Sequence, residues 1–256
     1  MKRALLTIVT LLSLGLPAIA QDDDLFGNTG STTSPEGFFI TMNANFDVPA
    51  GDMADRFGIS YRFGPSVLYK TKSNWLIGVK WDFISGANIR EDSLLINLAK
   101  DGGILNQQGV RTNVNVYERG YVVGVQAGKM FPVFKKNSAG SLFALTTLGF
   151  VQHKIKIFDR EKSIWSIRDE YNKGYDRLSN GIMVEEFAGY NYFSKKGYFS
   201  FYIGLNISAG FTAGRREFLY DVMRPDDKGR LDILYGVRGG IHIPIFKRKS
   251  EEFYFK

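Results

Sequence analysis

Residues that can do chemistry are few in this chain. It contains two histidines, His153 and His242, and no cysteine. The lack of cysteine excludes a thiolate metal site, a disulfide framework and a lipid-anchored lipoprotein. A hydrolase needs a nucleophile or an activated water held by a base, and a lone histidine is more often a hydrogen-bonded structural residue. We therefore expect no catalytic residue and no cofactor.

The acidic group Asp226, Asp227 and Asp232 is the other candidate for chemistry, as a site for a divalent cation. Carboxylate oxygens are the ligands that such cations prefer, but the group lacks the glycine and the ligand spacing of an EF-hand loop. The sequence therefore predicts no metal site.

The elements that position these side chains are predicted by a pattern of period two, in which apolar residues alternate with polar or small ones. In the clearest copy, alternate residues from Phe199 to Phe211 are apolar, and those from Ser200 to Thr212 are polar or small. Successive side chains of a strand point to opposite faces. Repeated segments of this kind indicate an all-β fold, a transmembrane antiparallel up-and-down β-barrel. About eight strands are expected, at 37–46, 57–70, 75–84, 117–131, 141–158, 180–193, 199–212 and 231–245.

The faces of these strands follow from the same alternation. In the third strand Trp75, Ile77, Val79, Trp81 and Phe83 are expected to face lipid. The fifth strand is assigned an outer face that consists of Phe143, Leu145, Thr147 and Val151. The mean hydropathy of -0.14 fits a barrel wall, because half of each strand faces lipid and half faces a polar lumen. The two histidines then lie at opposite ends of the barrel, so they cannot share one site.

The N-terminus has the features of an export signal. Lys2 and Arg3 precede an apolar run over 4–16, which is followed by the small-residue site at 18–20. We therefore expect a signal peptide over 1–20. The acidic stretch over 21–36, rich in glycine, serine and threonine, is predicted to be a flexible periplasmic segment. The barrel domain follows over 37–256.

The predicted connections alternate between short turns and long loops. Outer-membrane barrels keep short turns in the periplasm and long loops outside, so both termini are expected in the periplasm. The short turns are basic, and the basic rim that they form consists of Lys72, Lys135, Lys136, Lys195 and Lys196. This rim can attract anionic lipid or dock an acidic periplasmic partner, and the lipid interpretation is favoured. Location excludes nucleic acid as a partner despite the net charge of +7.

The lumen of an eight-stranded barrel is only wide enough to be filled by side chains. Inward positions supply charges of both signs, and buried charges must be paired. The sequence therefore predicts a neutralising plug that consists of Arg62, Lys80, Glu186 and Arg238. In the sixth strand the alternation fails, so Glu185 or Glu186 can be the inward member, with a bulge between them.

Several segments resemble small outer-membrane barrel proteins of Bacteroidota. They are PSVLYKTKSNW at 65–75, KGYDRLSNG at 173–181, FYIG at 201–204, GFT at 210–212 and RR at 215–216. The resemblance implies a location in the cell envelope and an accessory role beside a larger secretion, uptake or outer-membrane assembly complex. It implies no chemistry.

Three functions remain open at this point. The leading hypothesis is a non-enzymatic outer-membrane barrel with a packed lumen, a structural or interaction component of the envelope. Its expected partners are outer-membrane lipids and a periplasmic or outer-membrane protein complex. The alternatives are an enzyme that acts on lipid or peptide at the outer rim and a narrow solute channel.

Overall fold

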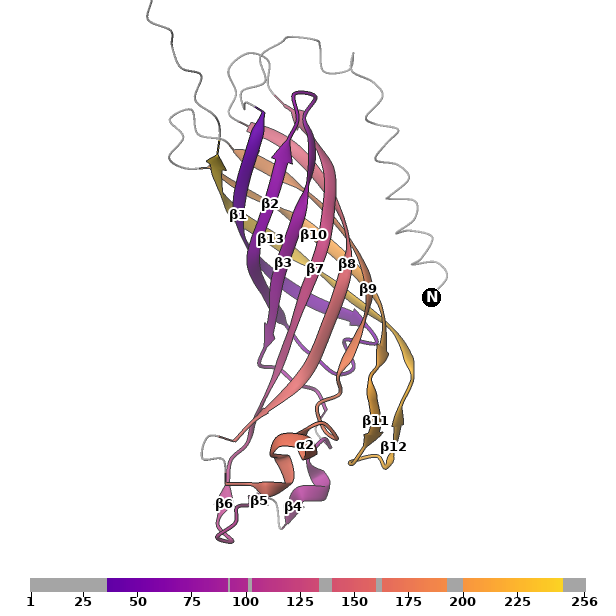
Figure 1. The fold of residues 1–256 in the computed structure, drawn as a ribbon. Helices are drawn as coiled ribbons and strands as arrows, with labels where there is room; N and C mark the ends of the chain where they lie inside the picture. Colours follow the sequence, from indigo (N-terminus) through magenta and orange to yellow (C-terminus); the bar gives the residue numbers. More distant parts are fainter. Residues whose placement is uncertain are drawn as a thin grey trace, which may run out of the picture.

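The computed structural model describes residues 36–91, 93–100, 103–133, 140–159, 163–192 and 200–245. Eight long strands close an antiparallel barrel in the order β1-β13-β10-β9-β8-β7-β3-β2 (Figure 1). Each barrel strand pairs with the next one along the chain, and β1 closes against β13, which confirms the predicted up-and-down barrel. The strands are β1 (Gly37–Gly51), β2 (Ser60–Lys70), β3 (Trp75–Gly86), β7 (Asn115–Pro132), β8 (Gly140–Phe158), β9 (Ser179–Tyr192), β10 (Ser200–Gly214) and β13 (Gly229–Ile245).

Several strands extend beyond their predicted ends. β1 continues past Phe46 to Gly51, because Asp47 and Pro49 keep the inward parity and pair with β13. The start of β1 lies beside the end of β13, through the pairing of Phe38 with Ile245. The start of β1 and the end of β13 therefore lie at the same end of the barrel as the β2–β3 turn (Figure 1). The predicted signal peptide over 1–20 lies outside the described residues.

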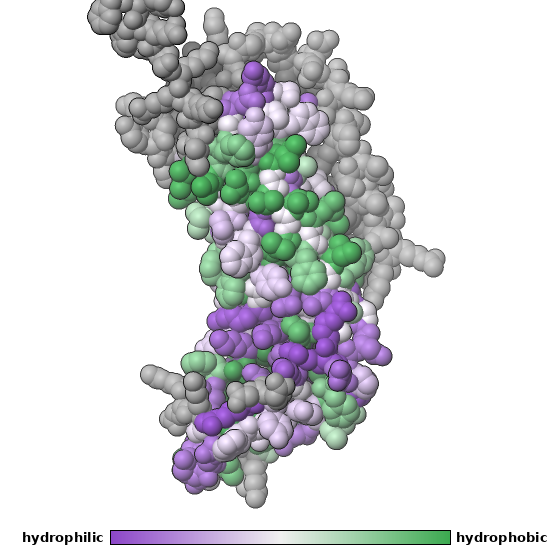
Figure 2. Space-filling view, viewed as in Figure 1, coloured by the Kyte–Doolittle hydropathy of each residue, from purple (hydrophilic) through white to green (hydrophobic). Residues whose placement is uncertain are grey.

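A belt of apolar side chains surrounds the barrel wall. On β3, Trp75, Ile77, Val79 and Trp81 are exposed, as the sequence predicts, and on β10 Leu205 is 69% exposed. Figure 2 shows this hydrophobic belt on one face of the barrel, with a mostly hydrophilic surface toward the loop end. A soluble surface rarely carries apolar patches of this extent. Lipid, in contrast, requires an apolar outer wall.

The long connections lie at the end of the barrel opposite the β2–β3 turn (Figure 1). They form a small sheet, a hairpin and short helical turns. These elements are η1 (Ile96–Leu98), β4 (Ala99–Lys100), β5 (Gly103–Leu105), β6 (Arg111–Thr112), η2 (Trp165–Ile167), α2 (Asp169–Asn172), β11 (Arg216–Leu219) and β12 (Arg224–Asp226). No helix within the described part of the chain is long and apolar enough to cross a membrane. Since long loops lie outside in outer-membrane barrels, this is the extracellular end.

Candidate functional site

The middle of the lumen holds three cations and three carboxylates. They are Arg62, Lys80, Arg238, Asp47, Asp82 and Glu185. Glu185 accepts hydrogen bonds from all three cations, at 2.5 Å from Arg62 Nη1, 2.5 Å from Lys80 Nζ and 3.2 Å from Arg238 Nη1. None of the six residues is more than 2% exposed. Their charges cancel, so this network, which we call the plug, meets the requirement that buried charges be paired.

Neutral polar side chains complete the plug. Asp47 receives two hydrogen bonds from Arg62, from Nε at 2.6 Å and from Nη2 at 3.1 Å. It also receives one from Asn206 Nδ2 at 2.8 Å. The hydroxyl of Tyr202 accepts from Arg238 Nε at 2.9 Å and donates to Asn43 at 2.7 Å. These hydrogen bonds satisfy donor and acceptor atoms that the ion pairs do not use. Such additional bonds stabilise a buried polar network.

The structure corrects the predicted plug at Glu186. The structure places Arg62, Lys80 and Arg238 in the network, but the carboxylate between them is Glu185. β9 pairs with β8 and β10 in continuous register through this point, so no bulge intervenes. Successive side chains of a strand point to opposite faces. Because Glu185 points inward, Glu186 lies on the outer side of the wall, where Thr146 Oγ1 donates to it at 2.9 Å.

Apolar and aromatic side chains fill the lumen on the periplasmic side of the plug. The cluster consists of Phe39, Leu68, Leu76, Met130, Phe143, Leu145, Phe187 and Tyr202. The faces predicted for the fifth strand are therefore wrong: Phe143, Leu145, Thr147 and Val151 point inward and are at most 4% exposed. β8 is apolar on both faces in this part, since Leu142 and Leu148 are exposed on the other side, and alternation alone does not say which apolar face meets lipid.

The two histidines lie at opposite ends of the lumen. His242 is near the periplasmic end, where its Nδ1 lies 2.8 Å from Thr41 Oγ1 and its ring stacks on Tyr202 at 5.0 Å. His153 is near the extracellular end, with Nε2 2.8 Å from Asp232 Oδ2. Thr212 donates to the same carboxylate oxygen at 2.5 Å. The His153 side chain is fully buried, so a lipid or peptide does not reach this group from outside.

Only one lysine of the predicted basic rim can be placed. Lys72 lies in the β2–β3 turn with its side chain 89% exposed, and its Nζ is 3.7 Å from Glu36 Oε2. Lys135, Lys136, Lys195 and Lys196 lie outside the described residues. An exposed ion pair of this kind contributes at most about 1 kcal/mol.

The extracellular loops pack against one another and against the barrel mouth. We call the described residues of 87–114, 159–178 and 215–228 the loop cap. Its apolar side chains form one buried cluster with the outer ends of the strands. The cluster includes Leu94, Ile164, Ile167 and Tyr175 from the loops, Met53 and Phe57 from the β1–β2 turn, and Ile155, Ile157 and Leu234 from β8 and β13. A shared apolar core gives the loop cap a defined shape.

Arg177 ties the three long loops together. Its Nε donates to Glu91 Oε2 at 2.8 Å, and its Nη2 donates to Asp221. Asn97 adds a second link, because its Nδ2 donates to the carbonyl oxygens of Tyr220 and Asp221 at 3.2 and 3.1 Å. The charge-assisted bonds of Arg177 are stronger than neutral ones. They hold the loop cap in the arrangement that forms its two hollows.

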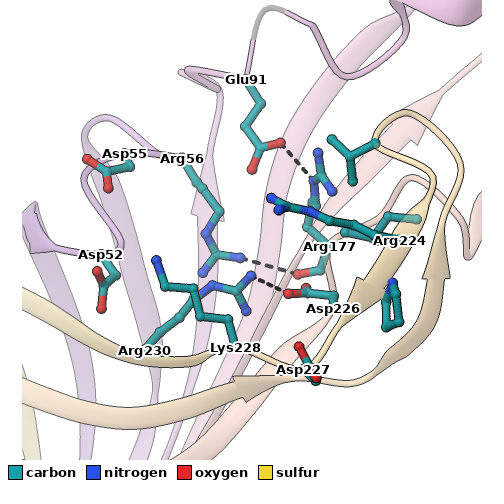
Figure 3. Close-up of a pocket in the computed structure, with 13 residues that line it drawn as sticks. Asp52, Asp55, Arg56, Glu91, Arg177, Arg224, Asp226, Asp227, Lys228 and Arg230 are labelled. Atoms are coloured by element: carbon teal, nitrogen blue, oxygen red, sulfur yellow. Dashed lines mark hydrogen bonds and ion pairs between the residues drawn. The ribbon is translucent and has the colours of Figure 1, made fainter.

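The first hollow is a charged cavity of about 320 Å³ beside the barrel mouth, lined by five acidic and five basic side chains (Figure 3). Four of these groups form ion pairs with one another, Arg177 with Glu91 and Arg230 with Asp226. Arg230 Nη2 lies 2.5 Å from Asp226 Oδ1, and Arg56 Nη1 donates to Ser179 Oγ at 3.1 Å. Burial lowers the pKa of the Arg56 guanidinium, and Asp232, 3.7 Å away, opposes the shift. The balanced signs favour no single class of charged ligand.

The predicted acidic group does not converge on one point. Asp226 pairs with Arg230, whereas Asp232 bonds His153 inside the barrel. Among the residues that the structure describes, no group of three or more histidine, aspartate or glutamate side chains is arranged to hold a metal ion.

The second hollow is an aromatic cleft of about 530 Å³ on the loop cap. It is lined by Leu98, Trp165, Ser166, Tyr171, Tyr175 and Tyr220. Trp165 is 65% and Tyr171 60% exposed, and the Arg168 guanidinium lies 5.3 Å from the Trp165 ring centroid. Tryptophan, tyrosine and arginine are the residues that most often dominate binding surfaces.

Sequence reasoning missed part of the site. The predicted first strand ends at Phe46 and leaves Asp47 in the connection that follows, although its position two residues after Asn45 keeps the inward parity of the strand. The loop cap carries no periodic signal, because its elements are two to four residues long. Arg177 therefore has no feature in the sequence that separates it from other loop arginines.

Comparison with known proteins found structural likeness only. No family model and no curated protein matches the chain. Similar solved structures include the attachment invasion locus protein Ail of Yersinia pestis in complex with sucrose octasulfate (12% identity, 82% of this chain, 99% of that chain, TM-score 0.38). Others are OprG (12%, 83%, 99%, 0.35) and the N-terminal barrel domain of OprF (10%, 81%, 99%, 0.34), both of Pseudomonas aeruginosa. Likeness at this level carries no argument about a role.

The wall of the barrel itself indicates where the protein is located. A closed barrel satisfies every backbone group of its strands internally, which a membrane interior requires. The apolar belt then provides the lipid-facing surface of an outer-membrane barrel. This chain is an outer-membrane β-barrel.

Proposed function

We propose that the protein is a non-enzymatic structural or interaction component of the cell envelope, with a closed lumen and an extracellular loop cap that contacts other molecules. In this proposal it is accessory to a larger secretion, uptake or outer-membrane assembly complex. The resemblance of several of its segments to small barrels of Bacteroidota supports the accessory role.

The plug is the observation that carries this proposal. Its six charged residues are at most 2% exposed, and the apolar cluster of Phe39, Phe143, Phe187 and others fills the lumen beneath it. An ion that passed through would have to displace paired charges at a cost of several kcal/mol each. A filled lumen favours a scaffold over a narrow solute channel.

The burial of His153 argues against an enzyme at the outer rim. His153 and Asp232 are close enough for proton transfer, but the histidine side chain is fully buried beneath the loop cap. A general base must come within hydrogen-bond distance of its substrate. The pair is better explained as a structural contact between β8 and β13.

The loop cap supports the interaction role. Two of its three long loops share an apolar core, and Arg177 links all three, which is more order than connections in solvent require. On this ordered base, Trp165 and Tyr171 remain exposed. Outer-membrane lipids are the other expected partners, at the apolar belt and at the basic rim.

Planar-bilayer recording tests the closed lumen. The purified protein should show negligible conductance, while a porin inserted at the same protein-to-lipid ratio conducts steadily. Steady, large single-channel conductance from the unmodified barrel would refute the plug and favour the channel.

A paired substitution tests the interaction role of the loop cap. The double variant Trp165→Ala with Tyr171→Ala should lose proteins that co-purify from native envelopes, because hot-spot aromatics dominate such contacts. Val110→Ala is a matched control, since Val110 is 59% exposed on another loop and does not line the aromatic cleft. Unchanged co-purification in the double variant would contradict this role of the cleft.

A further inference from the structure

The aromatic cleft of the loop cap draws its lining from all three long loops. One lining residue comes from the first loop, four come from the second and one comes from the β11–β12 hairpin, in chain order Leu98, Trp165, Ser166, Tyr171, Tyr175 and Tyr220. Four of these six side chains are aromatic, and none of the six carries a charge. The volume of about 530 Å³ is within the range of small-molecule sites.

The neighbouring loops hold Tyr220 in the cleft. Its backbone N–H donates to the carbonyl oxygen of Gly174 at 3.1 Å. A Cβ at position 174 would lie 2.0 Å from Cδ2 of Tyr220, so the glycine lets the ring pack directly on the backbone of the second loop. Asn97 of the first loop donates to the carbonyl oxygen of Tyr220 at 3.2 Å. The position of the ring is therefore set from two sides.

The aromatic rings form a concave corner. Tyr175 and Tyr220 lie 5.6 Å apart between ring centroids, with 70° between their planes. Tyr175 is 5% exposed, whereas Trp165 and Tyr171 are among the most exposed aromatic residues of the loop cap. Tyr175 thus forms the deep part of the cleft, and the two exposed rings form its outer part. The faces of such rings carry negative partial charge and attract cations.

A buried carboxylate adds negative potential near Tyr175. The Asp221 side chain is 2% exposed and accepts a hydrogen bond from Arg177 at Oδ2. Its Oδ1 is buried and has no hydrogen-bond partner among the described residues. Burial raises the pKa of the Tyr175 hydroxyl, and the Asp221 carboxylate and Tyr220 raise it further. A negative potential of this kind favours a cation in the cleft.

The uncharged lining decides which kind of cation fits. A primary ammonium group is strongly hydrated and has three N–H donors that need acceptors. A quaternary ammonium group has no N–H donor, and aromatic rings bind its methyl groups and its charge together. The Arg168 guanidinium lies 5.3 Å from the Trp165 ring centroid, but Arg168 is not one of the six residues that line the cleft. The contact shows that this ring attracts a cation.

We propose that the aromatic cleft binds a quaternary ammonium group of the kind that choline carries. The group belongs either to a free solute or to phosphocholine displayed on a surface, and both present the same trimethylammonium head. The inference rests on the proposed interaction role of the loop cap, and it names the chemical group that the cleft takes.

Titration of the purified protein with choline tests this proposal. The protein is kept in maltoside micelles, because detergents and lipids with a choline headgroup would compete. Saturation-transfer NMR follows the trimethyl protons. The matched ligand is the carbon isostere of choline, in which a neutral tert-butyl group replaces the trimethylammonium group. Choline should bind about tenfold more tightly than this isostere, as expected for one desolvated cation–π contact.

Substitutions at Tyr171 separate the aromatic face from apolar volume. Tyr171→Leu should weaken choline binding about tenfold, since leucine is apolar but has no aromatic face. Tyr171→Phe keeps the ring and should bind choline within about twofold of the wild type. Phe158→Leu is the matched control and should change nothing, since Phe158 is 44% exposed at the extracellular end of β8 and does not line the cleft. Heat-modifiable migration checks that each variant is folded.

Agarose beads that carry phosphocholine distinguish the two sources of the group. Retention on the beads, reversed by free choline, would identify a displayed headgroup, whereas binding of free choline without retention would identify a solute. The proposal is overturned if the isostere binds as tightly as choline, if Tyr171→Leu binds choline like the wild type, or if the folded protein binds no choline. Co-purification of proteins from native envelopes uses no choline, so the interaction role can stand when choline binding fails.

Discussion

Arg62 and Glu185 are 123 positions apart in the chain and meet at the centre of the barrel, with Arg62 Nη1 2.5 Å from Glu185 Oε2. Both side chains are fully buried. Glu185 also joins Lys80 and Arg238, so one carboxylate holds together charges from three other strands. Removing it leaves those cations buried without their shared partner.

Glu185→Gln should therefore lower the free energy of unfolding by about 3–5 kcal/mol, the usual cost of breaking a buried ion pair. Glu186→Gln should lower it by less than about 1 kcal/mol, since glutamine can still accept from Thr146. Urea titration of each variant in lipid vesicles, followed by tryptophan fluorescence, measures the difference. Equal losses at the two positions would show that the inward assignment is wrong.

Leu205→Arg should cost about 2–4 kcal/mol, because it puts a cation on the lipid-facing wall near the middle of the belt. Leu142→Arg is the depth control. Leu142 is also exposed, but it lies near the periplasmic end of β8, where the cost falls to about 0–1 kcal/mol. The free energies of unfolding in vesicles compare the two, and a larger loss at Leu142 would contradict the placement of the belt.

Gly204→Ala should destabilise the barrel by about 1–3 kcal/mol through overpacking. An added Cβ would lie 2.3 Å from the carbonyl oxygen of Ala188 and 2.7 Å from the Phe187 ring. Gly229→Ala is the matched control, because an added Cβ there has no atom within 4 Å, and it should change stability by about 0.5 kcal/mol or less. Thermal unfolding in micelles, read by heat-modifiable migration, ranks the two variants.

Arg177→Gln should loosen the loop cap and leave the barrel intact. It removes the links to Glu91 and Asp221, so proteases should cleave the three long loops about tenfold faster, as expected for the loss of one charge-assisted bond. Arg215→Gln is the control, since Arg215 donates to Asn180 at an exposed position. Limited proteolysis with mass spectrometry locates the cuts, and cleavage equal to wild type would remove Arg177 as the link.

The basic rim gives a prediction for the periplasmic end. Glutamate replacements made one turn at a time, at Lys72, then at Lys135 with Lys136, then at Lys195 with Lys196, should each weaken membrane insertion slightly. The losses should be similar and should fade with added salt, because a lipid belt depends on total charge. One dominant turn, with a co-purifying protein lost, would instead indicate a docked periplasmic partner.

The strand pattern alone predicts the barrel, its strand number and most of its lipid-facing residues. A strand buried on one side and facing lipid on the other must alternate in exposure. The residues of β3 do so over its full length, and those of β10 depart from the alternation at Ala209, which is buried. The same alternation predicts that the side chains of Arg62, Lys80 and Arg238 point into the lumen, because each lies between two lipid-facing residues of its strand.

The tertiary structure decides which side chains point inward where the alternation along a strand does not. Two acidic neighbours, Glu185 and Glu186, differ only in which one the closed register turns inward, and that register is set by pairing with β8 and β10. Phe143 and Leu145 fill the lumen because β8 is apolar on both faces, and only the closed barrel shows which face meets lipid. Arg177 joins loops far apart in the chain, and such long-range contacts leave no periodic trace in the residues that make them.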